Sequence, residues 1–175
     1  ELASPQRNPG GVLVPQIEKG LTGKGFEFLA EMERMHMIVD VSHLSDKGFW
    51  DIVEHGTRPF AASHSNCRAL APHTRNLTDE MIRALSERGG IAGLNYYAPF
   101  LDTDPTHPEN CRSTVELIAK HAGHYKQVGG AQMIALGSDF DGIDGPHQLE
   151  NAAFLPLLAD ALRKEGFTED EVEGI

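Results

Sequence analysis

Two histidines occupy matched positions in this 175-residue sequence. His43 closes a short apolar run at 37–41, and His64 closes the next run at 59–63, 21 positions further along the chain. A neutral imidazole at the end of a rigid strand is a good zinc ligand, because its ring offers a nitrogen lone pair. The alternative is that each histidine only caps its strand and bonds to the backbone. The matched positions favour a metal site.

A carboxylate follows a third apolar run in the same way. The run at 133–136 is followed by Gly-Ser-Asp-Phe-Asp-Gly at 137–142. Asp139 could take a proton from a metal-bound water and pass it to a leaving amine, which is general acid–base chemistry. Spacing alone does not decide between Asp139 and Asp141, and we expect Asp141 to cap the loop.

Other polar residues near these strand ends have weaker signals. Arg75 lies in the loop after the His64 strand and could clamp a substrate carboxylate, a role for which Arg68 competes. Cys67 follows His64 at H-x-x-C spacing, which alone is a weak zinc signal. The pair His121 and His124 shares one helix face, and without a third ligand we expect both to face solvent.

Apolar runs that alternate with amphipathic segments must position these residues. This alternation is typical of parallel βα units. A doubly wound sheet and a TIM barrel both fit it, but polar chemistry at three strand ends favours the barrel, and no G-x-G-x-x-G or Walker A loop is present. We predict strands at 37–41, 59–63, 91–97 and 133–136, and helices at 26–36, 45–54, 78–88 and 151–164, with capping boxes at 113–116 and 168–171 opening two more.

Length and composition indicate one domain over 1–175, with a loop-rich segment at 1–23 that holds a short extended piece at 11–15. The formal net charge of −11 argues against a nucleic-acid partner, because phosphates would be repelled. No apolar stretch is long enough for a membrane span. Two cysteines make no disulfide framework, and with the acidic composition this points weakly to the cytoplasm.

Five motifs together resemble those of the renal (membrane) dipeptidase family, a branch of the metal-dependent amidohydrolases. They are D-V-S-H at 40–43, S-H-S-N-C-R at 63–68, the Arg-Asn pair at 75–76, G-L-N-Y-Y at 93–97 and G-S-D-F-D-G at 137–142. The resemblance runs from about residue 20 to residue 175. It implies an α/β fold, a (β/α)8 TIM-like barrel, which hydrolyses dipeptides with two zinc ions by means of a metal-bound hydroxide.

The resemblance also implies roles for individual residues. His43 and His64 match two ligands of the second zinc, on strands five and six of the barrel. Arg75 matches a residue that grips the dipeptide, and Asp139 matches the proton shuttle on strand eight. Asn95 and Tyr97 match residues near the substrate.

The departures from the family pattern are as informative. The family supplies a His-x-Asp pair on its first strand, a bridging Glu on its third and a substrate-contacting His on its fourth, and this sequence has no His-x-Asp motif. A full barrel needs about 250 residues. We therefore expect the C-terminal half of a barrel, about four βα units corresponding to strands five to eight, which binds at most one zinc.

Three functions are compatible with this expectation. The first is a fragment of a zinc-dependent dipeptidase that is inactive or weakly active alone. The second is a non-catalytic half-barrel subunit or remnant, and a weaker third is hydrolysis of another amide or lactam. In each case exposed strand edges predict a partner, either the missing N-terminal half or a second copy of the chain.

Overall fold

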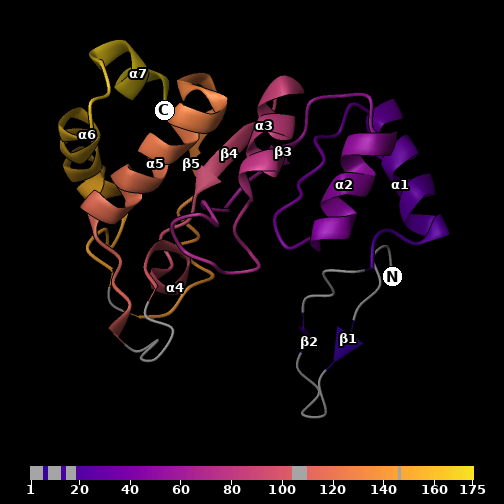
Figure 1. Cartoon of the computed structure of the whole chain (residues 1–175), viewed down its shortest axis with the longest axis horizontal. Coiled ribbons are helices and arrows are strands. Elements are labelled where there is room, and N and C mark those ends of the chain that lie inside the picture. Colours follow the sequence, from indigo (N-terminus) through magenta and orange to yellow (C-terminus); the bar gives the residue numbers. More distant parts are fainter. Residues whose placement is uncertain (1–5, 8–12, 15–18, 104–109, 146) are drawn as a thin grey trace.

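A small parallel sheet covered by helices forms the centre of the molecule (Figure 1). The computed structural model describes residues 19–103, 110–145 and 147–175, and the backbone of two short strands at 6–7 and 13–14. The strands are β1 (Gln6–Arg7), β2 (Leu13–Val14), β3 (Ala61–Ala62), β4 (Ile91–Leu94) and β5 (Ile134–Leu136). The helices are α1 (Gly23–Arg34), α2 (Asp46–His55), α3 (Asp79–Glu87), α4 (Ala98–Leu101), α5 (Val115–Gly129), α6 (Leu155–Lys164) and α7 (Glu169–Gly174), with 3-10 turns η2 (Ala131–Met133) and η3 (Ala152–Phe154).

The sheet has the order β3-β4-β5, and all its pairs are parallel. A parallel bridge between Asp40 and Ala61 adds one more position outside β3. The sheet positions therefore follow one another in chain order, as expected for consecutive βα units. β1 and β2 pair separately and antiparallel, and β2 falls within the extended piece predicted at 11–15, the rest of which lies outside the described residues.

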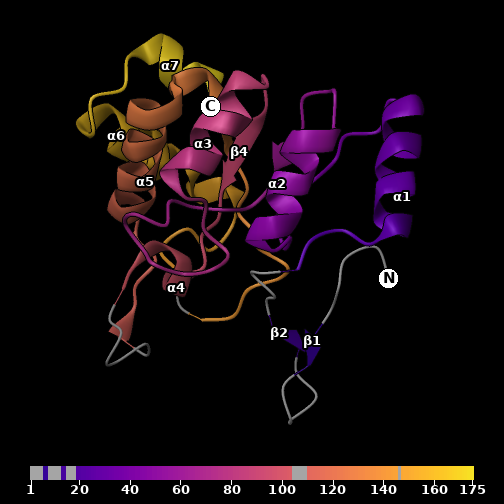
Figure 2. The same ribbon diagram turned by 45° about the vertical axis from the view of Figure 1, so that its right-hand side comes forward.

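Helices cover one face of this sheet and leave the other open. Helices α2, α3, α5 and α6 pack against one another in that order, as Figures 1 and 2 both show. Ala62, Ala92 and Leu94 point into this layer and have no exposed surface. On the other face the register aligns Asp40, Ala61 and Ile91, and Ile91 is 47% exposed.

Polar caps place the helix ends close to where the sequence predicts them. The side chains of Ser45, Thr78 and Thr168 accept hydrogen bonds from the first turns of α2, α3 and α7. The second predicted capping box, at Thr168–Glu171, is present in full. The first is wrong by one residue, because Thr114 rather than Ser113 caps α5. α1 also starts earlier than expected, at Gly23, because Thr22 caps it.

The first predicted strand is much shorter than its apolar run. Within 37–41 the bridge at Asp40 is the strand pairing that the structure records. Val39 and Val41 are buried against the helices, but Met37 and Ile38 are 50% and 74% exposed, so the strand predicted at 37–41 is reduced to this bridge and part of its apolar run is open to solvent. Ile38 shares the open face with Asp40, where no described element packs over it.

Candidate active site

The rings of His43 and His64 meet where the strands end, as the sequence predicts. Their Nε2 atoms lie 2.9 Å apart, and the ring centroids lie 4.9 Å apart. Two nitrogens bound to one tetrahedral zinc at about 2.0–2.1 Å would be separated by roughly 3.3 Å, slightly more than the separation of this pair. Burial lowers the pKa of His43 below its ordinary value, and the nearby positive charge of Arg75 lowers it further.

Strained backbone marks two of the predicted site residues. His43 has φ of 78° and Asp139 has φ of 63°, a region that non-glycine residues rarely adopt. The one further such residue in the described part of the chain is His36 (φ 58°), which directly follows the C-cap of α1, where left-handed residues are common. Strain of this kind concentrates at functional sites.

Arg75 carries a half-buried guanidinium whose hydrogen-bonding capacity is only partly used. Its Nε and Nη2 atoms are buried and have no hydrogen-bond partner among the described residues. The group stacks 5.2 Å from the ring centre of Phe100. Burial lowers its pKa, and the negative charges of Asp139 and Asp40 offset part of that effect. Arg68, the competing candidate, is already engaged, because it grips both carboxylate oxygens of Asp46 at 2.6 and 2.7 Å. The geometry therefore favours Arg75 as the residue free to bind an anion.

A buried network of three asparagines joins the loops around this site. Asn66, Asn76 and Asn95 have no exposed surface. Asn76 accepts from the backbone N–H of Asn66, and Asn66 accepts from that of Asn95. Asn95 then donates from Nδ2 to Asp139 Oδ2 at 3.0 Å, and its own Oδ1 accepts from the N–H of Tyr97. The network thereby ties Asp139 to the loops that follow His64 and β4.

Helix α5 fixes the turn after His64 from behind. His121 Nδ1 accepts from the backbone N–H of Cys67 at 3.0 Å, and Tyr125 donates its hydroxyl proton to the carbonyl of Ser65 at 2.7 Å. The expectation that His121 and His124 face solvent is wrong. His121 is fully buried, and burial lowers its pKa to about 4, while His124 pairs with Asp79 at 2.7 Å.

The remaining candidates separate clearly. Cys67 is buried, its thiol donates to the His121 carbonyl, and burial raises its pKa, so it is poorly placed as a ligand. Tyr97 packs edge-on against Phe100, whereas Tyr96 is buried. Asp141 is exposed. Among the described residues no group of three His, Cys, Asp or Glu side chains is arranged to hold a metal ion.

Sequence reasoning missed several residues that form hydrogen bonds to the candidate site residues or to their loops. Asp40 accepts a hydrogen bond from the hydroxyl of Ser63 at 2.5 Å, and that hydroxyl lies 2.7 Å from His64 Nδ1. Asn66 and His121 were likewise not foreseen in these positions. The parallel register beside Ala61 brings Asp40 next to Ser63, and the sequence carried no signal for that register.

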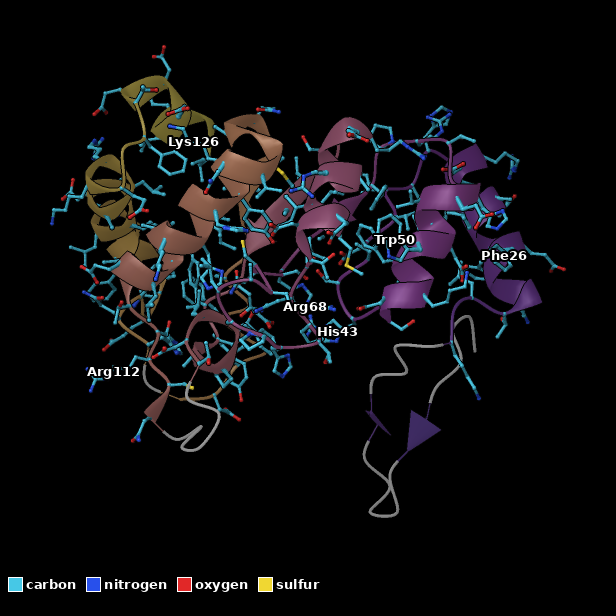
Figure 3. The ribbon with its side chains drawn as sticks, in the orientation of Figure 1. Phe26, His43, Trp50, Arg68, Arg112 and Lys126 are labelled. Atoms are coloured by element: carbon cyan, nitrogen blue, oxygen red, sulfur yellow. The ribbon has the colours of Figure 1, made fainter. Side chains whose placement is uncertain are left out.

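Figure 3 shows that His43 and Arg68 come from loops that approach one another at the end of the sheet, far from Lys126 on α5. Both line a narrow depression together with Arg75 and Asn76. This is the end of the sheet at which α/β barrels carry their functional residues. A family model described as membrane dipeptidase (peptidase family M19) matches residues 4–175. The chain belongs to this family.

Individual relatives agree with this assignment. The dipeptidase tcpJ of Claviceps purpurea is 34% identical over 160 residues, covering 91% of this chain and 36% of that protein. The protein from the pqqA 5′ region of Klebsiella pneumoniae is 39% identical over 155 residues, covering 89% of this chain and 56% of that protein. The chain thus spans about half the length, or less, of these curated relatives.

Solved structures match the fold as well. The metallopeptidase of Rhodobacter sphaeroides, liganded with a phosphinate mimic of the dipeptide L-Ala-D-Ala, superposes with a TM-score of 0.81 at 34% identity, covering 89% of this chain and 44% of that chain. An amidohydrolase of Pseudomonas aeruginosa superposes with a TM-score of 0.77 at 25% identity, covering 89% and 54%. The α/β fold with its parallel three-stranded sheet therefore matches part of the dipeptidase structures. No helix in the described part of the chain has the length and apolarity that crossing a membrane requires.

Proposed function

We propose that the chain forms part of a zinc-dependent dipeptidase and contributes one histidine pair, the carboxylate-binding arginine and the proton-transfer carboxylate of its active site. The observation that carries this proposal is the Arg75 guanidinium, which has two buried nitrogens without a hydrogen-bond acceptor and lies near the facing rings of His43 and His64. Buried donors without an acceptor are costly, so such a group supports an anionic ligand.

The two imidazoles are suited to one zinc ion. Their Nε2 atoms already face each other at 2.9 Å. When bound, zinc supplies a Lewis acid that polarises a carbonyl and lowers the pKa of water. Because no group of three metal-ligating side chains occurs among the described residues, the remaining ligands must come from water or from another part of the complete barrel. We therefore expect the chain alone to bind zinc weakly, with at most one ion per chain.

Arg75 would orient the substrate, and Asp139 would transfer a proton to it. The fork of a guanidinium matches a carboxylate, and a dipeptide carries one at its C-terminus. The dipeptide mimic bound by the Rhodobacter sphaeroides relative supports this substrate class. Asp139, held at Oδ2 by Asn95, would give a proton to the departing amine, and Tyr97 would border the same space.

A second function is favoured by the incomplete ligand set. A half-barrel that serves only as a subunit would keep the fold and need no third ligand. The two functions differ in zinc content, because a remnant has no reason to retain a metal affinity that depends on both histidines.

The decisive measurement is zinc per chain, by elemental analysis of protein purified without added metal. We expect a substoichiometric to single zinc content that is lost in the His43→Ala/His64→Ala variant and kept in His55→Ala, a control on α2 away from the site. Dipeptide hydrolysis by the chain alone should be weak or absent. Equal zinc content in all three proteins contradicts the proposal, and strong hydrolysis that survives the double substitution contradicts the assigned residues.

A further inference from the structure

A hydrogen-bonded chain runs from Asp40 through Ser63 to the ring of His64. Asp40 Oδ2 accepts from Ser63 Oγ at 2.5 Å, and Ser63 Oγ lies 2.7 Å from His64 Nδ1. Asp40 Oδ1 accepts two backbone N–H groups, those of Ser42 at 3.0 Å and Ser63 at 2.9 Å. Both oxygens of the carboxylate are therefore used as acceptors.

The direction of these hydrogen bonds decides where His64 carries its proton. A hydroxyl has one proton to donate, and an ionised carboxylate can only accept. Ser63 therefore donates to Asp40, and its lone pairs face His64 Nδ1. That nitrogen must then be the protonated one, because two acceptors cannot bond to each other. The lone pair of His64 is left on Nε2, the atom that faces His43 at 2.9 Å.

The backbone of His64 is held by other hydrogen bonds than those that connect Asp40, Ser63 and the His64 ring. Its N–H donates to Ser42 Oγ at 3.0 Å, and Ser42 Oγ lies 3.0 Å from Ser65 Oγ. Behind the turn, Tyr125 bonds to the Ser65 carbonyl. With the main chain fixed, the Asp40–Ser63 pair controls the ring itself, its orientation and its tautomer.

We propose that Asp40 and Ser63 are positioning residues that lock His64 in the tautomer with a free Nε2, ready to bind a metal ion. This inference rests on the proposed function for the metal, but the tautomer is a property of the metal-free chain. Partners that fix the tautomer of a ligating histidine typically change metal affinity by about 10- to 100-fold.

An isosteric substitution can reverse the direction of the two hydrogen bonds that connect residue 40, Ser63 and the His64 ring. In Asp40→Asn the amide oxygen can still accept the two backbone N–H groups, and the amide nitrogen replaces Oδ2. It donates to Ser63, which must then donate to His64 Nδ1 and so leaves the proton on Nε2. We expect zinc affinity to fall by about tenfold. Ser63→Ala, which removes the link without imposing the wrong tautomer, should cost less.

The double variant Asp40→Asn/Ser63→Ala separates positioning from damage to the fold. If the reversed donor causes the loss, removing Ser63 restores affinity to the level of Ser63→Ala alone. If the double variant binds zinc no better than Asp40→Asn, the loss is structural and the proposal is overturned. Zinc titration by calorimetry gives the affinities, and the absorption bands of bound Co²⁺ check the geometry.

A second readout needs no metal. Imidazole ¹⁵N spectra of the metal-free proteins should show His64 protonated at Nδ1 in the parent chain and at Nε2 in Asp40→Asn, with the exposed His55 unchanged. A parent chain with the His64 proton on Nε2 overturns the proposal whatever the zinc data. If the tautomer switches as expected but none of the proteins binds zinc, the control of the His64 tautomer by Asp40 and Ser63 is supported and the proposed dipeptidase function fails.

Discussion

At the scale of single residues, the site combines backbone strain with unsatisfied hydrogen-bond donors. His43 and Asp139 hold positive φ, and two buried guanidinium nitrogens of Arg75 have no hydrogen-bond partner among the described residues. Each of these features costs folding free energy, and none improves the packing of the core. Residues that reduce stability while they converge on one point are best explained by a ligand that they serve.

His43→Gly should therefore separate stability from metal binding. Glycine adopts positive φ without steric cost, so we expect the free energy of unfolding to rise by about 1 kcal/mol while the zinc content falls. Urea unfolding at pH 8 measures the first quantity. His64→Gly is the control, because His64 is not among the positive-φ residues and its substitution should lower stability. Equal losses in both variants contradict the strain argument.

The pKa of His43 tests whether the guanidinium of Arg75 lies close to the histidine pair. Burial lowers this pKa, and the cation of Arg75 lowers it further by disfavouring the imidazolium. Arg75→Met removes the charge and keeps the apolar stem on Phe100, so the pKa of His43 should rise towards its ordinary value. NMR titration of the His43 ring measures it. Arg68→Met is the matched control and should leave it unchanged, because Asp46 already neutralises Arg68.

At the scale of elements, α5 serves as the anchor for the loop that carries His64. His121 spans from α5 to two other segments, since Nδ1 accepts from the Cys67 N–H and Nε2 lies 3.0 Å from the Leu101 carbonyl. The ring must be neutral for Nδ1 to accept. Stability should therefore depend on keeping this one imidazole unprotonated.

Acidification should weaken the fold through His121. The folded pKa is about 4, whereas an unfolded histidine titrates near 6.5, so between these values the unfolded state binds more protons. The stabilisation is complete above pH 6.5, and about 3 kcal/mol is lost as the pH falls towards 4. Urea unfolding across this range measures the slope. His121→Gln should flatten it, whereas His55→Gln should not, and equal slopes in all three proteins contradict this origin.

Sequence patterns placed the main helices well, but they overestimated the lengths of the strands and did not predict the contacts between elements. Ser45 and Thr78 predict the starts of their helices because capping depends only on neighbouring residues. The strand-end positions of His43 and His64 follow from the βα alternation. The burial of His121 could not be predicted, since its partners lie 54 and 20 positions away in the sequence. The pairing of Asp40 with Ser63 likewise depends on strand register, which periodicity does not set.

At the scale of the whole molecule, the open face of the sheet is the main apolar surface that no described element covers. Ile38 and Ile91 are 74% and 47% exposed on it, beside the intermediate Ala61 and Ala135. In the solved relatives this chain corresponds to less than half or about half of the polypeptide. We propose that the remainder of a barrel, supplied by another polypeptide segment, covers this face, in preference to a second copy, because each copy carries a net charge of −11.

An apolar surface of this kind should attract a hydrophobic dye and promote association. We expect Ile38→Lys/Ile91→Lys to reduce dye binding and the mass measured by light scattering. Phe28→Lys, at a residue 49% exposed on α1, is the matched control and should have little effect. A parent chain that stays monomeric and binds no dye argues against a docking role for this face.

The strand order β3-β4-β5, with Asp40 beside β3, has a consequence for how the chain opens and closes. Each strand neighbours the ones next to it in sequence, so the contacts are largely between consecutive units, as in repeat proteins. Such a chain can fray from either end while its middle persists. Amide hydrogen exchange should then be slowest in β4, which has a partner on both sides, and progressively faster towards the bridge at Asp40 and towards β5. The two histidines follow the Asp40 bridge and β3, at one of the two edges that open first, so local opening there should separate their rings while the rest of the sheet stays closed.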